Sequence, residues 1–397
     1  MRTELKRLAI LGGAPAFSEP LHVGRPNIGD RQAFIRRVED MLDRRWFTNN
    51  GPYVQEFERR IAEMVGVKHC VAVCNATIGL EIATRAAGLR GEVIVPSFTF
   101  IATAHALQWQ EITPVFCDVA PGSHHIDPAQ VERMITPRTT GIIGVHVWGV
   151  PCDIEALTEI AQRRGLHLMF DAAHAFGCSY RGRMIGSFGE AEVFSFHATK
   201  FLNSFEGGAV CTNDDRLAER MRFMRNFGFA GVDDVDFIGT NGKMTEVCAA
   251  MGLTSLESLD EIVAVNRRNY LAYQQVLAPF DGIQLYAYDE TERCNYQYVI
   301  VEVDETRAGI SRDALVKVLQ AENVLARRYF YPGAHQMEPY QSYFPHARLL
   351  LPETERLVQR VMSLPTGTAV SVQDIEKIGA IIEAAIAQRA EILEVLR

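Results

Sequence analysis

Lys200 is the residue of this chain best placed for covalent chemistry. It stands in FSFHATKFLNSFEGGAV (194–210), among apolar, hydroxyl and glycine residues, and it is one of only six lysines. An amine withdrawn from water has a lowered pKa and can attack a carbonyl carbon to form a Schiff base. The segment alone also allows a phosphate contact or a buried ion pair. Lys243, in GTNGKM, is the other lysine in a suggestive setting, and a solvated lysine explains it equally well.

A carboxylate and an imidazole follow the apolar run LHLMF (166–170), at Asp171 and His174. A carboxylate buried without a cationic partner is very costly. A structural ion pair with an arginine, or a metal held together with His174, would provide that partner. The protonated pyridine nitrogen of a cofactor would also provide it, with His174 holding the Asp171 carboxylate by a hydrogen bond.

Residues that suit a phosphate follow two other predicted strands. Ala76 and Thr77 open a helix directly after HCVAVC (69–74), and the N–H groups of a helix N-terminus attract anions. A plain helix cap would give the same pattern. Ser195 and His197 follow the next buried run in the order expected for a phosphate ligand and its polar support.

Taken together, an amine for a Schiff base, a carboxylate for a pyridine nitrogen and a phosphate cradle predict a pyridoxal phosphate pocket. Neither G-x-G-x-x-G nor a P-loop stands at a suitable strand-to-helix turn, which argues against a nucleotide site. No G-x-S-x-G elbow supports a hydrolase. The adjacent pair His124 and His125 has no H-E-x-x-H motif or cysteine cluster beside it, so we expect no metal.

These side chains need a parallel sheet to bring them together. Short apolar runs alternate with helical spacing from about 38 to 210, which predicts βαβ units. The runs mostly lack period-2 alternation, as strands buried on both faces do. Ligands of such sheets bind beyond the carboxyl ends of the strands. We expect seven strands at 69–74, 92–96, 113–119, 140–149, 166–174, 191–196 and 207–212, with helices at 55–65, 78–87, 102–109 and 154–164.

The pattern changes beyond residue 244. A long helical stretch (245–277), a strand (296–303), a helix (311–323) and a final helix (371–396) predict a smaller α+β domain. We therefore expect an α/β chain with an N-terminal arm over 1–30, a large domain over 31–250 with a mostly parallel seven-stranded sheet flanked by helices, and a small C-terminal domain over 251–397.

Composition excludes several classes of protein. At 397 residues and 48% hydrophobic content the chain can bury a large core. Its net charge of -9 gives no basic field for nucleic acid, so we expect no nucleic-acid partner. No run of about 18 apolar residues predicts a membrane span. The eight scattered cysteines are typical of a reduced, cytoplasmic protein.

The ordered motifs resemble the DegT/StrS-type nucleotide-sugar aminotransferases, which are fold type I, aspartate-aminotransferase-like enzymes that use pyridoxal 5'-phosphate. The resemblance covers nearly the whole chain. Its segments occur in family order: TNNGPYVQEFE (48–58), CNATIGLEIA (74–83), VPSFTFIATAHAL (95–107), FDAAHAFG (170–177), the 194–210 segment, GTNGKMTEVCAAMGLTSLE (239–257), YFYPGAH (329–335) and SLPTG (363–367).

The resemblance implies a role for each matching residue. Lys200 would form the Schiff base with the cofactor and move the proton, and Asp171 would pair with the pyridine nitrogen. The residues implied at the phosphate are Ala76, Thr77 and Ser195. Phe100 would stack on one face of the cofactor ring, with His174 near its edge.

The resemblance also implies a partner subunit and a sugar site. Asn241 matches a residue that completes the phosphate pocket of the neighbouring subunit, which implies a homodimer with active sites at the interface. Tyr331 and His335 match a segment near the sugar in relatives. The usual GEGG reads FEGG at 205–208, which is typical of a subgroup with a fuller pocket wall.

The substrate follows from the same resemblance. Relatives with histidine in place of Lys200 are sugar dehydratases, so the lysine implies ping-pong transamination, with L-glutamate as amino donor. The motifs look most like enzymes that aminate C4 of dTDP-4-keto-6-deoxyglucose, a branch that feeds antibiotic and surface-polysaccharide sugars. The alternatives are C3 amination of a dTDP-3-keto-6-deoxyhexose, amination of a keto-inositol, and a non-catalytic protein that kept the fold.

Overall fold

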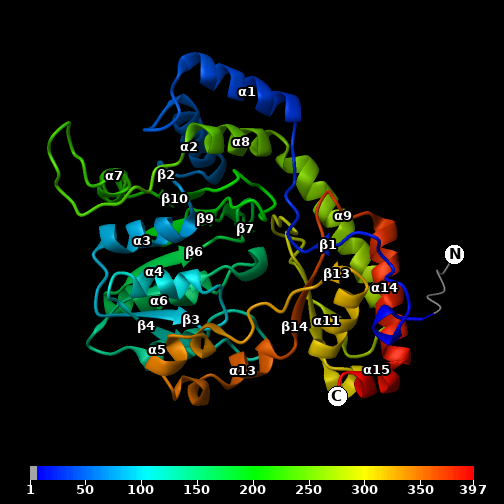
Figure 1. The fold of residues 1–397 in the computed structure, drawn as a ribbon. Helices are drawn as coiled ribbons and strands as arrows, with labels where there is room; N and C mark the ends of the chain where they lie inside the picture. The colour runs from blue at the N-terminus through cyan, green and yellow to red at the C-terminus, as the bar shows by residue number, and fades with distance from the viewer. Residues whose placement is uncertain (1–6) are drawn as a thin grey trace.

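The computed structural model describes residues 7–397, arranged as a large lobe built on one sheet and a smaller lobe at the C-terminal end of the chain (Figure 1). Residues 1–6, which begin the predicted arm and include Lys6, lie outside the described residues.

The central sheet has seven strands in the order β2-β10-β9-β6-β5-β3-β4. β10 runs antiparallel to both of its neighbours, and the other pairs are parallel. The prediction of a mostly parallel seven-stranded sheet is therefore confirmed. The strands are β2 (His69–Val73), β3 (Glu92–Pro96), β4 (Thr113–Cys117), β5 (Thr139–Val145), β6 (His167–Asp171), β9 (Ala191–Ser195) and β10 (Gly208–Thr212).

Both faces of this sheet are buried under helices. Successive side chains of a strand point to opposite faces, so each strand contributes to two cores. In β2, for example, Cys70 and Ala72 join the core on one face, and Val71 and Val73 join the core on the other. The first face is covered by α2 (Pro52–Val65), α5 (Pro128–Met134), α6 (Ile154–Arg164) and α8 (Glu246–Glu257). The second is covered by α3 (Ala76–Ala87), α4 (Ala102–Gln108) and α7 (Asp215–Met224).

The small lobe has its own antiparallel sheet, in the order β11-β12-β14, and a separate core. Its strands are β11 (Ile283–Leu285), β12 (Val299–Val303) and β14 (Val361–Leu364). Its helices are α9 (Leu259–Leu277), α11 (Arg312–Ala321), α14 (Val372–Ala387) and α15 (Arg389–Val395).

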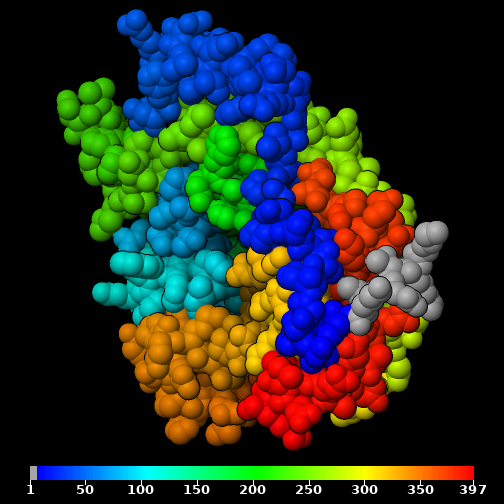
Figure 2. Space-filling view, turned by 45° about the vertical axis from the view of Figure 1, so that its right-hand side comes forward, coloured from blue at the N-terminus to red at the C-terminus, as the bar shows by residue number. Residues whose placement is uncertain are grey.

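The N-terminal arm packs on the small lobe before the chain enters the large one. Leu8 and Phe17 join the small-lobe core, and β1 (Leu21–His22) pairs in parallel with β13 (Val324–Leu325). Figure 2 shows the arm, in dark blue, running down the face where the two lobes meet. α1 (Arg31–Arg44) then packs on α8. The predicted domain boundary at 250/251 falls inside α8, and the division into domains stays a prediction.

The remaining short elements connect these layers. They are η1 (Ala9–Leu11), η2 (Val147–Gly149), β7 (Ser179–Tyr180), β8 (Arg183–Met184), α10 (Glu305–Ala308), η3 (Ala334–Gln336), α12 (Tyr340–Tyr343), η4 (Ala347–Leu350) and α13 (Pro352–Val358). Across residues 7–397, no helix combines the length and the apolar character that a membrane crossing needs.

Candidate active site

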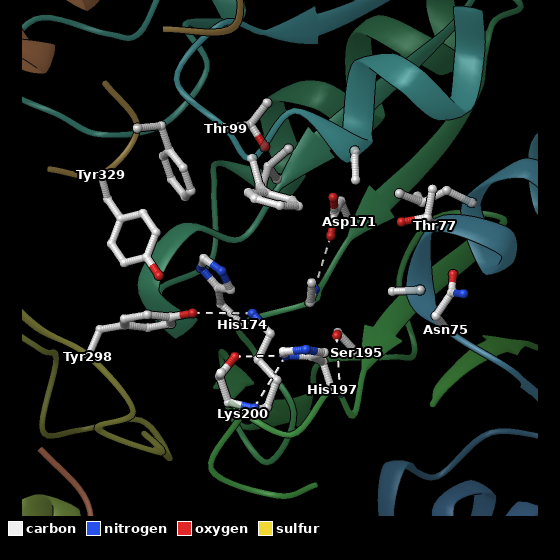
Figure 3. A pocket seen from close by; sticks show the side chains of 18 of the residues that line it. Asn75, Thr77, Thr99, Asp171, His174, Ser195, His197, Lys200, Tyr298 and Tyr329 are labelled. Carbon is white, nitrogen blue, oxygen red and sulfur yellow. Dashed lines mark hydrogen bonds between the residues drawn. The ribbon is translucent and has the colours of Figure 1, made fainter. Parts of the chain in front are cut away.

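A pocket of about 580 Å³ lies beyond the carboxyl ends of β2, β5, β6 and β9. Figure 3 shows Asn75 and Thr77 on one side of it, Tyr298 and Tyr329 on the other, and Lys200 and Asp171 between them. Seven of the ten site residues predicted from sequence line this pocket, and three do not. The seven are Ala76, Thr77, Phe100, Asp171, His174, Ser195 and Lys200.

The Lys200 amine enters the pocket from the loop that follows β9. Its Nζ donates a hydrogen bond to Tyr298 Oη at 3.2 Å. Loss of hydration around the amine lowers the pKa of Lys200 to about 8, and the charge interactions with Tyr329 and Asp171 only partly oppose this effect. A larger fraction of the amine is therefore neutral near physiological pH, as a nucleophile requires.

In the ligand-free protein, we expect the Lys200 amine to be half-protonated near pH 8 rather than near its usual 10.5. Burial disfavours the ammonium form, so the pKa falls. Competitive acetylation at a series of pH values, read by peptide mass spectrometry, would measure the midpoint. The same peptide from a Lys200→Arg variant, which has no amine to acetylate at that position, gives the background. A midpoint above pH 10 would contradict the expectation.

Asp171 ends β6 and is buried. Its Oδ2 accepts a hydrogen bond from Thr103 Oγ1 at 2.8 Å, and its Oδ1 accepts one from the Ala173 N–H at 3.1 Å. Burial raises the pKa of the Asp171 carboxyl, while these two hydrogen bonds and the charge of Lys200 oppose the rise. The carboxylate is thus held in one orientation, ready for a cationic partner in the pocket.

His174 does not form the predicted hydrogen bond with Asp171. Its Nδ1 instead accepts a hydrogen bond from the backbone N–H of Trp148 at 3.2 Å. Its ring stacks on the Trp148 indole, with ring centroids 5.7 Å apart. Burial lowers the pKa of His174, so the ring is neutral and carries its proton on Nε2. Aromatic packing, rather than a bond to the carboxylate, sets the position of this imidazole.

The opposite end of the pocket is the N-terminus of α3. Asn75 caps this helix, and its Oδ1 accepts from the Ile78 N–H at 2.9 Å. Ala76 and Thr77 occupy the first turn, where N–H groups have no acceptor within a helix. A Cβ on Gly208 would lie 2.7 Å from the Ala76 nitrogen, so only glycine lets β10 pack against this turn. Ser195 Oγ accepts weakly from the His197 N–H at 3.5 Å.

This donor set fits pyridoxal phosphate. A partly desolvated amine, a fixed buried carboxylate and a helix N-terminus with nearby hydroxyls match a carbonyl, a pyridine nitrogen and a phosphate respectively. Within residues 7–397 no group of three or more His, Cys, Asp or Glu side chains is arranged to hold a metal ion.

Tyr331 and His335 lie outside the pocket lining. The Tyr331 ring lies against the guanidinium of Arg328, 4.2 Å from ring centroid to carbon. His335 is buried, and its ring nitrogens contact Ser97 Oγ at 2.6 Å and Glu355 Oε1 at 2.7 Å. The contacts of Tyr331 and His335 fix the position of the 329–335 segment. Tyr329 and Phe330 of the same segment line the pocket instead.

Asn241 is exposed and lies outside the pocket of its own chain, paired with Asn226 through a β-bridge. Phe205 does not line the pocket either, so the expected fuller wall at FEGG is not formed within this chain. The Phe205 ring instead packs edge-on against Phe34 of α1, with centroids 5.5 Å apart.

Sequence reasoning missed several pocket residues. Tyr298, Tyr329 and Arg327 come from the small lobe and reach the pocket only through the packing of the two lobes. Thr103 lies outside the pocket lining, and its hydroxyl contacts that of Thr99, four residues earlier, at 2.9 Å, a spacing that could have suggested a polar pair. No local pattern indicated that the pair supports Asp171.

Several known proteins are similar to this chain in sequence. The sequence profile of the DegT/DnrJ/EryC1/StrS aminotransferase family matches residues 29–383. A dTDP-4-amino-4,6-dideoxy-D-glucose transaminase of Shigella dysenteriae is 37% identical over 82% of this chain and 88% of its own. The Escherichia coli protein of the same name is 33% identical over 90% of this chain and 96% of its own.

A solved structure gives a similar result. The crystal structure of DesI in the presence of its TDP-sugar product has 50% sequence identity and a TM-score of 0.94, and the match covers 98% of this chain and 99% of that one. Similarity therefore extends over both lobes and the pocket between them.

Proposed function

The chain belongs to the DegT/DnrJ/EryC1/StrS aminotransferase family, and from this membership we propose that it transfers the amino group of L-glutamate to C4 of dTDP-4-keto-6-deoxyglucose. It is a sugar aminotransferase whose cofactor is pyridoxal 5'-phosphate. The observation that carries the proposal is that Lys200 and the buried Asp171 line one pocket. The similarity to two dTDP-4-amino-4,6-dideoxy-D-glucose transaminases supports the choice of substrate.

When bound, the cofactor supplies an aldehyde for amines and a protonated ring that takes up electrons from the reacting carbon. Asp171 would hold the proton at the ring nitrogen, and the Thr103 hydroxyl keeps that carboxylate in place. The N-terminus of α3 and Ser195 would hold the phosphate. Phe100, at the pocket wall, would cover one face of the ring.

Lys200 would carry the proton in both halves of the reaction. A neutral amine can take a proton from the reacting carbon and return it on the next step, and a pKa near 8 suits both tasks near neutral pH. Tyr298 Oη accepts one N–H of this amine and would keep it aimed into the pocket. The keto-sugar would then accept the amino group that L-glutamate delivered.

The proposal includes a homodimer. The loop at 225–242 projects from the large lobe beside α7 (Figure 1). It exposes large apolar side chains that a partner subunit would cover. They are Phe227, Phe229, Val232, Val235 and Ile238. Asn241 follows this apolar stretch. A partner subunit that covers the loop would therefore bring its phosphate site close to Asn241 of this chain. Exposed apolar patches of this kind commonly mark protein interfaces.

Mixed dimers test the shared site. Co-expressed Lys200→Ala and Asn241→Asp chains, tagged differently and purified by both tags, should recover amino transfer that neither homodimer shows. Each mixed dimer has one intact site of two, so we expect about half the wild-type activity. A mixed dimer no more active than the two parent variants would contradict the shared site.

Product analysis tests the reaction itself. Purified protein is incubated with L-glutamate and either dTDP-4-keto-6-deoxyglucose or a dTDP-3-keto-6-deoxyhexose, and the product is identified by mass and NMR. We expect a 4-amino-4,6-dideoxy sugar from the first compound. An amine at C3, formed only from the second, would refute the C4 assignment. A protein that converts neither sugar, and whose yellow cofactor colour does not fade when L-glutamate is added, would refute the reaction.

A further inference from the structure

Asn27 joins the segment that carries Lys200 to two distant parts of the chain. Its Nδ2 donates to the main-chain carbonyl oxygen of Phe201 at 3.0 Å, and the main-chain carbonyl oxygen of Asn27 accepts from Asn203 Nδ2 at 2.8 Å. Its Oδ1 accepts from the N–H of Thr368 at 3.0 Å and from the Thr368 hydroxyl at 2.9 Å. With 4% of its surface exposed, Asn27 makes these bonds away from water.

Glycines let the three segments approach one another. The lysine loop (197–204) meets the arm at Gly24, where an added Cβ would lie 2.8 Å from Thr199 Cβ. Gly367, with φ +99, has a backbone conformation that favours glycine, and an added Cβ there would lie 3.2 Å from Asn27 Oδ1. A larger side chain at Gly24 or Gly367 would therefore push apart the arm, the lysine loop and the turn after β14.

The small lobe supports the lysine loop at a second point. Gln297, just before β12, accepts from the Phe201 N–H at 3.4 Å through its Oε1. The next residue, Tyr298, accepts from the Lys200 amine. Phe201 is thus held at its carbonyl oxygen by the arm and at its N–H by the small lobe. Neither of these two hydrogen bonds involves a residue at the phosphate end of the pocket.

We propose that Asn27 is a positioning residue for Lys200, acting through the backbone of Phe201 and the side chain of Asn203. The inference rests on the proposed role of Lys200 in both half-reactions. Proton transfer needs the amine within a few tenths of an ångström of its productive position, so a loosened loop slows the chemistry without removing any reacting group. Because both half-reactions use the same amine, both should slow by a similar factor.

The test is Asn27→Leu, which keeps the number and branching of the side-chain heavy atoms and removes the hydrogen bonds of the side chain to Phe201 and Thr368, while the main-chain bond to Asn203 stays. In single-turnover experiments on the holoenzyme, the donor and keto-sugar half-reactions should both slow about tenfold or more. Hydrogen–deuterium exchange of peptides covering the lysine loop should become faster, while cofactor content stays at wild type. The matched control is Lys377→Met, which removes a contact to the arm at the Ala16 carbonyl oxygen (3.3 Å), far along the arm from the lysine loop, and should change neither rate.

The outcomes separate this inference from its alternatives. Rates within twofold of wild type would overturn it, and so would slowing of one half-reaction alone, which marks a substrate contact. If Asn27→Leu does not fold, Asn27→Asp carries the same expectation, because its carboxylate still accepts from Thr368 but cannot donate to Phe201. A protein inactive on dTDP-4-keto-6-deoxyglucose, but with a slower donor half-reaction and faster loop exchange in the variant, would refute the proposed substrate and support the role of Asn27.

Discussion

Lys200→Ala should abolish amino transfer and the visible absorption band that a Schiff base between Lys200 and pyridoxal phosphate gives the purified protein. The variant removes the lysine amine of the pocket lining, which makes a hydrogen bond to Tyr298 and has a pKa of about 8. The reaction would lose both its covalent anchor and its proton carrier. General acid–base catalysis alone contributes up to about 10⁴-fold, so we expect a fall of at least that size in kcat.

The measurement needs a control that separates chemistry from folding. Lys317→Ala removes an exposed lysine from α11 and should keep both the band and the activity. Lys200→Ala should still bind the cofactor through the phosphate end, at reduced affinity, and should unfold at a temperature close to that of wild type. An alanine variant that keeps the absorption band and turns over at more than one-tenth of the wild-type rate would refute the assignment of Lys200.

The large lobe was predictable because its signals are local. Each of the seven strands is a short apolar run, and burial on both faces makes such runs continuous. Lys200, Asp171 and Thr77 could be placed for the same reason, since each stands at or just beyond the end of such a run. A sheet topology that aligns strand ends then brings them to one pocket.

The rest of the site depends on contacts between residues far apart in the sequence. Tyr298 and Asn27 reach the lysine loop only after the small lobe and the arm pack on it, and no spacing along the chain encodes this. The short strands β11 and β14 carry too few residues for a periodic signal. His335 and Tyr331 were placed by motif, and motif position alone does not tell which way a side chain points.

Asp171→Asn should lower kcat by about 10³-fold and leave the absorption band in place. Asparagine has nearly the same shape, and its side-chain oxygen can still accept from the Thr103 hydroxyl that now binds Oδ2 at 2.8 Å. What it lacks is the negative charge that keeps a proton on the ring nitrogen. Removing a single preorganised hydrogen-bond donor from an active site costs about 10²–10³-fold in kcat, and here a full charge that acts in both half-reactions is removed.

A companion variant isolates the charge from its support. Thr103→Val keeps the Asp171 carboxylate and removes one hydrogen bond to it, which is worth about 1.5–3 kcal/mol because the acceptor is charged. Thr103 does not touch the reacting groups, so only part of this energy reaches the transition state and kcat should fall by about tenfold or less. Steady-state rates at saturating substrates, together with cofactor content and spectra, compare the two. Since Asp171 is buried and asparagine fills its space, loss of fold does not account for a slow Asp171→Asn enzyme with an intact absorption band. A rate for Asp171→Asn within tenfold of wild type would contradict the role of the carboxylate charge. A Thr103→Val enzyme slower than Asp171→Asn would contradict it too.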